Sequence, residues 1–200
     1  MTDSYLTING RSTGEYSEKR SKFLAFAFHV ESVEEVKLLV GQYEKEYYDA
    51  RHVCYAYVLG HLRNMFRAVD NGEPSGTAGK PILGQLNKNN LTNTLIIVVR
   101  YFGGIKLGTS GLQNAYKQAA AEAIAVANIE ERTVDIIFEV YFEYPLMNEV
   151  MRVVKELNPH VLAQDFQTDC LLRLSIRQGE AHHLTERLKL IRGVKVVEPE

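Results

Sequence analysis

The chain has 200 residues, of which 46% are hydrophobic and 24% are charged, and its formal net charge is −2 at pH 7. This composition is typical of a globular protein, and it excludes a chain that binds nucleic acid through a large overall positive charge. No apolar run is long enough to span a bilayer, and the first residues lack the apolar core of a signal peptide. We therefore expect a cytoplasmic protein with no membrane partner, in which any recognition of phosphate is local.

The chemistry-bearing Cys and His residues do not form a metal-ligand pattern. Cys54 and Cys170 lie far apart in apolar segments, so we expect both to be small buried side chains rather than a disulfide or a zinc ribbon. His182 and His183 have no carboxylate or thiol partner at ligand spacing. The sequence therefore predicts no metal site and no cofactor.

The first predicted elements follow a polar start. Residues 22–30 form an apolar run rich in aromatic side chains, which predicts a strand. Ser32 and Glu35 have the spacing of a capping box, and the apolar stripe after them predicts a helix that ends near Asp49. Residues 52–59 alternate as a strand does, and this strand is expected to begin at a histidine.

A long segment without periodicity comes next, at residues 60–86. It contains three turn signals, at residues 70–72, 74–76 and 79–81, and a short helix is possible over residues 78–86. Because long loops within compact domains are usually functional or disordered, and this one mixes polar, small and kinked residues, we expect a functional loop.

The central stretch of the chain has the order strand, glycine-rich turn, helix. The β-branched run at residues 95–99 predicts a buried strand, and glycines at 103, 104, 108 and 111 precede an Ala-rich helix. Ser110 and Gln113 have capping-box spacing, which would leave the other amides of the first helical turn free. Such an arrangement is typical of an anion-binding site.

The remainder of the chain has the element order of a ferredoxin-like domain, with four antiparallel strands and two helices on one face. We place the boundary near residues 128–132, which gives domains 1–129 and 130–200. The predicted elements are a strand at 133–142, a helix from 145 to 157, strands at 161–166 and 170–176, a helix at 181–191 and a strand at 194–197.

Three polar residues in the first domain could act in catalysis. His52 could face the glycine turns, although a lone histidine there is more often structural. Asp70 and Glu73 could form a carboxylate pair with separated pKa values, but an aspartate in an Asp-Asn-Gly turn usually binds the backbone. Because the common hydrolase and nucleotide-hydrolase motifs are missing, we expect no enzymatic activity.

Basic and aromatic residues cluster around the two glycine-rich loops, where they could contact a phosphodiester backbone and stack on bases. Scattered surface cations and core aromatics would give the same pattern, so both interpretations stay open. The candidate nucleic-acid or anion-binding residues are Arg63, Arg67, Lys80, Arg100, Tyr101, Gly103, Gly104, Lys106, Gly108, Thr109 and Ser110, with Phe102 interleaved.

Two segments, DNGEPSGTAGKPIL at residues 70–83 and VVRYFGGIKLGTSGLQNAY at residues 98–116, resemble the YigZ/IMPACT family, as do ARHVCYAYVLG and RSKFLA nearer the start. The similarity runs the length of the chain. The family signature falls on Asp70, Gly72, Glu73, Pro74, Gly76, Thr77, Arg100, Tyr101, Gly103, Gly104, Lys106, Leu107, Gly108 and Gly111.

The resemblance implies an α+β fold. The first domain would be similar to the second domain of ribosomal protein S5, and the second to the last domain of elongation factor G. Both folds occur on the ribosome, and the eukaryotic relative is a translation regulator. The resemblance transfers no catalytic residue.

Our leading hypothesis is a regulator of translation that binds RNA or the ribosome through the glycine-rich basic loops. The alternatives are a protein-protein interaction module, as in the eukaryotic relative, and a small-molecule or nucleotide-binding enzyme, because some small-molecule kinases also use the S5-like fold.

Overall fold

The computed structural model describes residues 3–198, and these form two compact units. One unit comprises residues 5–132, and the described part of the other comprises residues 3–4 and 133–198. Within residues 3–198, no helix combines the length and the apolar character that crossing a membrane requires.

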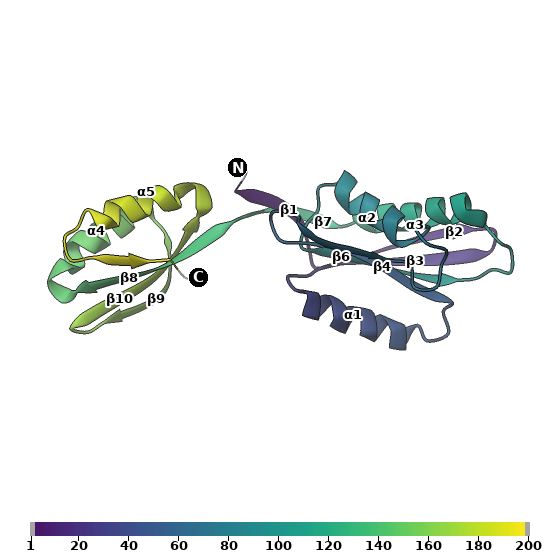
Figure 1. Ribbon diagram of the computed structural model, residues 1–200, viewed down its shortest axis with the longest axis horizontal. Coiled ribbons are helices and arrows are strands. Elements are labelled where there is room, and N and C mark those ends of the chain that lie inside the picture. The colour runs from purple at the N-terminus through teal and green to yellow at the C-terminus, as the bar shows by residue number, and fades with distance from the viewer. Residues whose placement is uncertain (1–2, 199–200) are drawn as a thin grey trace. The chain divides into compact units, whose positions relative to one another are not determined.

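The N-terminal unit is built on a five-stranded antiparallel sheet in the order β2-β3-β6-β4-β5. Helix α1 covers one face, and α2 and α3 cover the other (Figure 1). The strands are β2 (Arg11–Glu18), β3 (Ser21–His29), β4 (His52–Leu59), β5 (Met65–Val69) and β6 (Thr94–Tyr101); the helices are α1 (Val33–Glu46), α2 (Gly79–Lys88) and α3 (Gly108–Ala125).

The central strand β6 is apolar throughout because both of its faces are buried. Leu95, Ile97 and Val99 pack under α1, whereas Ile96 and Val98 pack under α2 and α3. A strand covered on both sides loses the polar alternation of a half-exposed strand. The prediction of a buried strand here is therefore confirmed, and so are the predicted helices α1 and α2.

Four strands were not predicted, and β2 shows one physical reason. In β2, Ser12 and Gly14 face α3, and an added Cβ at Gly14 would lie 2.3 Å from the Ala123 nitrogen. Close packing against the helix thus selects small residues instead of the large apolar ones that signal a strand. The others are β5 and the two-stranded sheet of β1 (Ser4–Asn9) and β7 (Asn128–Thr133), which covers the predicted domain boundary.

The C-terminal unit has the predicted βαββαβ order, and its four strands form an antiparallel sheet in the order β11-β8-β10-β9. The two helices pack against one face of this sheet, on a core that includes Phe138, Leu172 and Leu184 (Figure 1). The elements are β8 (Asp135–Glu143), a 3₁₀ turn (Tyr144–Leu146), α4 (Met147–Leu157), β9 (His160–Phe166), β10 (Asp169–Arg177), α5 (Gln178–Lys189) and β11 (Lys195–Val197).

Both units combine helices with antiparallel sheets, which confirms the predicted α+β class. The segment predicted as a long loop contains β5 and α2, so the irregular part is confined to residues 60–64 and 70–78.

Candidate functional site

The loop at residues 70–78 is held in place by the carboxylate of Asp70. Its two oxygens accept hydrogen bonds from the backbone N–H groups of Gly76, Ala78 and Gly79 at 2.8–3.0 Å. Burial raises the pKa of Asp70, but these donors and Lys80 outweigh burial, so the pKa lies below its ordinary value. Asp70 therefore ties the loop to the start of α2, as the structural interpretation of this turn predicts.

Glu73 has a different role, because the loop directs its side chain into the protein. Its carboxylate forms an ion pair with Arg100 Nη1, and Tyr116 donates its hydroxyl hydrogen to Glu73 Oε1 at 3.0 Å. His52 Nε2 lies 3.9 Å from the same oxygen. The side chains of Glu73 and Arg100 are only 3% and 6% exposed, so this ion pair is buried.

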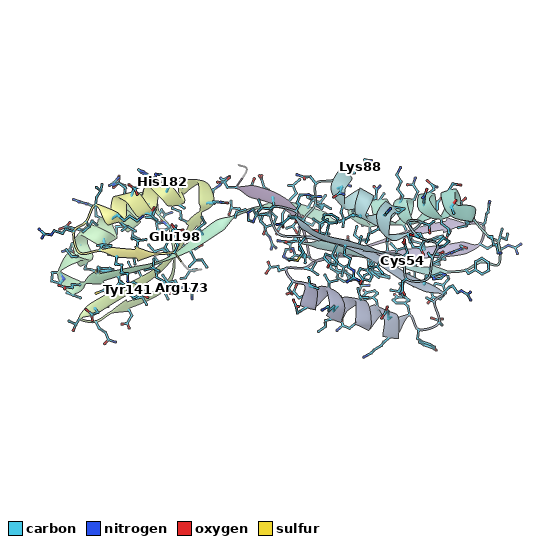
Figure 2. The ribbon with its side chains drawn as sticks, viewed as in Figure 1. Cys54, Lys88, Tyr141, Arg173, His182 and Glu198 are labelled. Atoms are coloured by element: carbon cyan, nitrogen blue, oxygen red, sulfur yellow. The ribbon has the colours of Figure 1, made fainter. Side chains whose placement is uncertain are left out.

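Two weakly acidic groups complete the cluster. Cys54 Sγ lies 2.8 Å from the Asp70 carbonyl oxygen and 3.4 Å from the Tyr116 hydroxyl. Figure 2 shows Cys54 inside this unit. Burial raises the pKa of Cys54 to about 12, and it also raises the pKa of Tyr116. Both groups are protonated at neutral pH, so the Cys54 thiol is a hydrogen-bonding core residue and not a ready nucleophile.

The orientation of His52 is fixed by the turn beside it. His52 Nδ1 lies 2.9 Å from the Asn71 carbonyl oxygen, which can only accept, so Nδ1 carries the proton and Nε2 faces Glu73. Gly72 has φ +86°, and a Cβ there would lie 3.1 Å from His52 Nδ1. A glycine at this position is thus required both by the backbone and by the ring.

His52, Glu73 and Arg100 of this cluster line a cavity of about 480 Å³, which we call the Glu73 hollow. Its wall combines the start of β4, the loop, the end of β6 and the beginning of α3. The lining residues are Arg51, His52, Glu73, Pro74, Arg100, Phe102, Lys106, Leu107, Gly108, Thr109 and Leu112.

A second depression lies on the other side of the contact between the loop and α3. We call it the Lys80 groove; it has a volume of about 470 Å³ and is wide open to solvent. Gln113 Nε2 approaches the Gly76 carbonyl oxygen at 3.5 Å, and both residues line this groove. The groove is lined by Gly76, Lys80, Pro81, Ser110, Gln113, Asn114 and Lys117.

The predicted capping box at Ser110 and Gln113 is wrong. Helix α3 begins at Gly108, its N-cap residue is Leu107, and no side chain caps it. Ser110 therefore lies within the first turn, too late to serve as a cap. Gly108 takes φ +73°, a conformation that glycine adopts at little cost. The first-turn amides of α3 are thus uncapped by side chains, as the anion-binding hypothesis needs, but for another reason.

The structure brings together part of the predicted set of binding residues. Lys106, Gly108 and Thr109 line the Glu73 hollow. Lys80 and Ser110 line the Lys80 groove.

Arg100 is not the surface cation that we expected. We expected it to supply charge to a phosphodiester backbone, but its guanidinium is buried against Glu73 and lies over the rings of Phe23 and Phe102. An exposed polynucleotide backbone does not reach a side chain that is 6% exposed. The register of β6 explains the burial, because Arg100 points to the face that α3 covers.

Three other predicted residues lie away from both depressions. Arg63 follows the far end of β4 and donates to the Leu91 carbonyl oxygen and to Asn87 Oδ1. Arg67 pairs with Tyr57 in the strand register and so lies on the α1 face.

Tyr101 also lies on the α1 face, where it packs against the core beneath α1 and its hydroxyl donates to Asp49. For these residues, sequence proximity to the loops did not give spatial proximity.

The Gly103-Gly104 pair has a structural explanation. A Cβ at Gly103 would lie 2.0 Å from the carbonyl carbon of Arg20, and its N–H already donates to Ser21 Oγ. Gly104 has φ +84° and open space around its Cα. Gly103 is therefore a point of close chain approach, and its amide is not free for an anion.

The sequence analysis missed several residues that the fold adds to the site. Arg51 was not considered, and Tyr116 was placed only in the apolar stripe of its helix. Asn114 and Lys117 are on the exposed side of α3. Helical spacing from Ser110 would have found the last two, but no local signal connects Tyr116 to Glu73, which is 43 residues away.

The described residues 3–198 contain no group of three or more His, Cys, Asp and Glu side chains that could hold a metal ion.

Residues 19–124, more than half of the chain, match the family described as the Impact N-terminal domain. The chain belongs to the IMPACT family. It is 34% identical over 156 residues to the IMPACT family member YvyE of Bacillus subtilis, covering 78% of this chain and 72% of that relative. It is also 31% identical over 172 residues to YigZ of Escherichia coli, covering 85% and 84%.

The crystal structure of a hypothetical protein has the same fold along the whole chain. It matches with a TM-score of 0.75 and 29% sequence identity, covering 100% of this chain and 99% of that one. The resemblance seen in the sequence is thus confirmed at the level of the family and of the two-unit fold.

Proposed function

We propose that this IMPACT family member is a regulator of translation that binds RNA, or a particle that contains RNA such as the ribosome, along the Lys80 groove. The supporting observation is the lining of this groove. It has two lysines, Lys80 and Lys117, and three uncharged polar side chains, with no carboxylate among the residues that line it. Such a surface fits phosphate and ribose oxygens.

The openness of the groove agrees with a polymeric ligand. Lys80 is exposed at the start of α2, and Gln113, Asn114 and Lys117 are exposed on α3, so a nucleotide chain can pass across them without entering the protein. The uncapped N-terminus of α3 adds a positive partial charge at one end. Binding would be dominated by phosphate contacts and would carry little sequence preference.

The proposal involves no catalysis. The buried thiol and phenol of the neighbouring cluster are protonated at neutral pH, so they do not serve as nucleophiles. Membership of the IMPACT family supports a role in translation, because the resemblance to this family implies one. We expect a protein with this role to act in the cytoplasm.

The salt dependence of RNA affinity tests the proposal. For a single-stranded RNA, the logarithm of the binding constant should fall linearly with the logarithm of the salt concentration. The double variant Lys80→Ala/Lys117→Ala should bind about tenfold more weakly at low salt, and its slope should be lower by roughly 0.7 per lost phosphate contact. Fluorescence anisotropy with a labelled oligonucleotide measures both quantities.

The matched control removes the same charge elsewhere. Lys37 lies on α1 and Lys88 at the end of α2, and both are exposed outside the groove (Figure 2 labels Lys88). The Lys37→Ala/Lys88→Ala variant should keep the wild-type slope. Equal losses in the two variants, or an affinity independent of salt, would contradict the proposal. A partner that stays bound in cells after nuclease treatment, and is lost in neither variant, would favour a protein-interaction module instead.

A further inference from the structure

The Glu73 hollow has an excess of positive charge that its own residues do not neutralise. Arg51, Arg100 and Lys106 face it, and Glu73 is the one carboxylate among its lining residues. The formal balance of these four groups is thus +2. Glu73 is already paired with Arg100, which leaves Arg51 and Lys106 at the exposed rim.

Arg100 lines this hollow and has a buried N–H group without a hydrogen-bond partner. A guanidinium has five N–H donors. Within residues 3–198, Nη1 of Arg100 donates a hydrogen bond to Glu73 Oε1. Its Nε is buried and has no hydrogen-bond partner among these residues. Burying a charged donor group in this way costs free energy. The guanidinium lies over the rings of Phe23 and Phe102, 5.5 Å from each centroid, and these cation–π contacts help to hold it in place.

The beginning of α3 adds a second feature that attracts an anion. Gly108 and Thr109 belong to its first turn and line the hollow. The helix has 18 residues and no side-chain cap, so its first N–H groups need acceptors from outside the helix. The buried, underused Arg100 and the uncapped helix therefore serve the same hollow.

The rest of the wall is apolar. Pro74, Phe102, Leu107 and Leu112 form it, and the volume of about 480 Å³ is in the range of small-molecule sites. An inorganic ion would leave these side chains without contact. A ligand that fits the whole hollow therefore combines an anionic group with an organic body.

We propose that the Glu73 hollow binds a small organic phosphate monoester. A phosphate monoester carries a charge of about −1.5 to −2 at pH 7, which matches the formal +2 of the hollow. Its phosphate would lie between Lys106, Arg51 and the first turn of α3, and its organic body would contact Phe102 and Leu112. This site is separate from the Lys80 groove, so the inference goes beyond the proposed function.

Two sources share this chemistry: a free phosphorylated metabolite and the 5′-phosphorylated end of an RNA. Phenyl phosphate is a simple probe of the shared chemistry, and phenol is its counterpart without the phosphate. In isothermal titration of the full chain, phenyl phosphate should bind saturably at one site. Phenol should bind at least 100-fold more weakly.

Two neighbouring residues of α3 provide a matched pair of variants. Thr109 lines the Glu73 hollow, whereas Ser110 lines the Lys80 groove. A glutamate at either position is favourable for the helix, because acidic side chains stabilise a helix N-terminus, so both variants should fold. Thr109→Glu should weaken phenyl phosphate binding at least 100-fold by repulsion, and Ser110→Glu should change it less than threefold.

The inference is overturned if phenyl phosphate shows no saturable binding, or if the two glutamate variants lose it equally. If phenyl phosphate binds as expected, competition assigns the source of the phosphate. Displacement of phenyl phosphate by a 5′-phosphorylated RNA hexamer, but not by its 5′-hydroxyl counterpart, assigns the site to an RNA end; displacement by neither assigns it to a free metabolite. The groove is tested separately, because the 5′-hydroxyl RNA binds there through Lys80 and Lys117.

Discussion

The two compact units differ in the polar side chains that they bury. In the N-terminal unit, Glu73 and Arg100 are buried together with a tyrosine hydroxyl and a thiol. In the described part of the C-terminal unit, the buried polar side chains are Ser175 and Thr185, and the core is otherwise apolar. Burying charge is costly and is therefore informative, so the difference points to the N-terminal unit as the one that carries the site.

A comparison of two ion pairs between a glutamate and an arginine gives the largest expected effect. Glu73→Ala leaves the buried Arg100 charge and the Tyr116 hydroxyl without their acceptor, and should lower the free energy of unfolding by about 3–5 kcal/mol. In the C-terminal unit, Glu156 forms a bidentate pair with Arg187 at the surface, at 2.6 and 3.0 Å. Glu156→Ala should have little effect, because solvent and salt screen an exposed pair.

Urea unfolding followed by circular dichroism measures both variants. The prediction would be contradicted if Glu73→Ala had the wild-type midpoint of urea unfolding, or if Glu156→Ala lowered the free energy of unfolding more than Glu73→Ala. Glu73→Gln is a useful addition, because it removes the charge and keeps one acceptor oxygen. It should fall between wild type and Glu73→Ala.

The anchoring carboxylate of the loop gives a smaller effect that depends on pH. The pKa of Asp70 is lowered from 3.8, so the folded state binds this proton less readily than the unfolded state. Asp70 therefore stabilises the protein above about pH 4, and this stabilisation is lost as the pH falls through the lowered pKa. Asp70→Asn should lower the free energy of unfolding by about 2 kcal/mol at pH 7. The change removes the negative charge and replaces one of the two oxygens that accept the three backbone hydrogen bonds.

Measuring the midpoint of urea unfolding between pH 7 and pH 3 tests this prediction. The gap between wild type and Asp70→Asn should narrow as the pH falls from about 4 towards the lowered pKa of Asp70, because the unfolded wild-type chain takes up the proton before the folded one does. A gap that stays constant with pH would mean that the charge of Asp70 contributes nothing to the stability of the loop.

The last prediction concerns the reactivity of the two cysteines in the folded protein and involves no substitution. Burial raises the pKa of both thiols, that of Cys54 to about 12, and Cys54 also hydrogen-bonds inside the site. Neither should be alkylated by iodoacetamide at pH 8 in the folded protein, and both should react in concentrated guanidinium chloride. Mass spectrometry of peptides measures each site; rapid labelling of Cys54 in the folded protein would contradict the protonated, enclosed cluster.

The fold was more predictable than the site. Helix α1 was correct, including its cap, where Ser32 Oγ accepts from the Glu35 N–H. The βαββαβ order was also correct. Strands β2 and β7 were missed because polar and small residues dominate strands that lie at an edge or pack closely against a helix.

The sequence by itself determined the class of the fold and most of the elements, and its motifs resemble the family that the comparisons show. The fold class and the elements follow from local periodicity and turn residues, which do not depend on long-range contacts. Only the tertiary structure decided which cations are available. Strand register buries Arg100 and turns Arg67 and Tyr101 to the other face, while the packing of α3 brings Tyr116 to Glu73. Side-chain direction in a sheet reverses with a shift of one residue, so a site built across strands depends on a register that the sequence does not display.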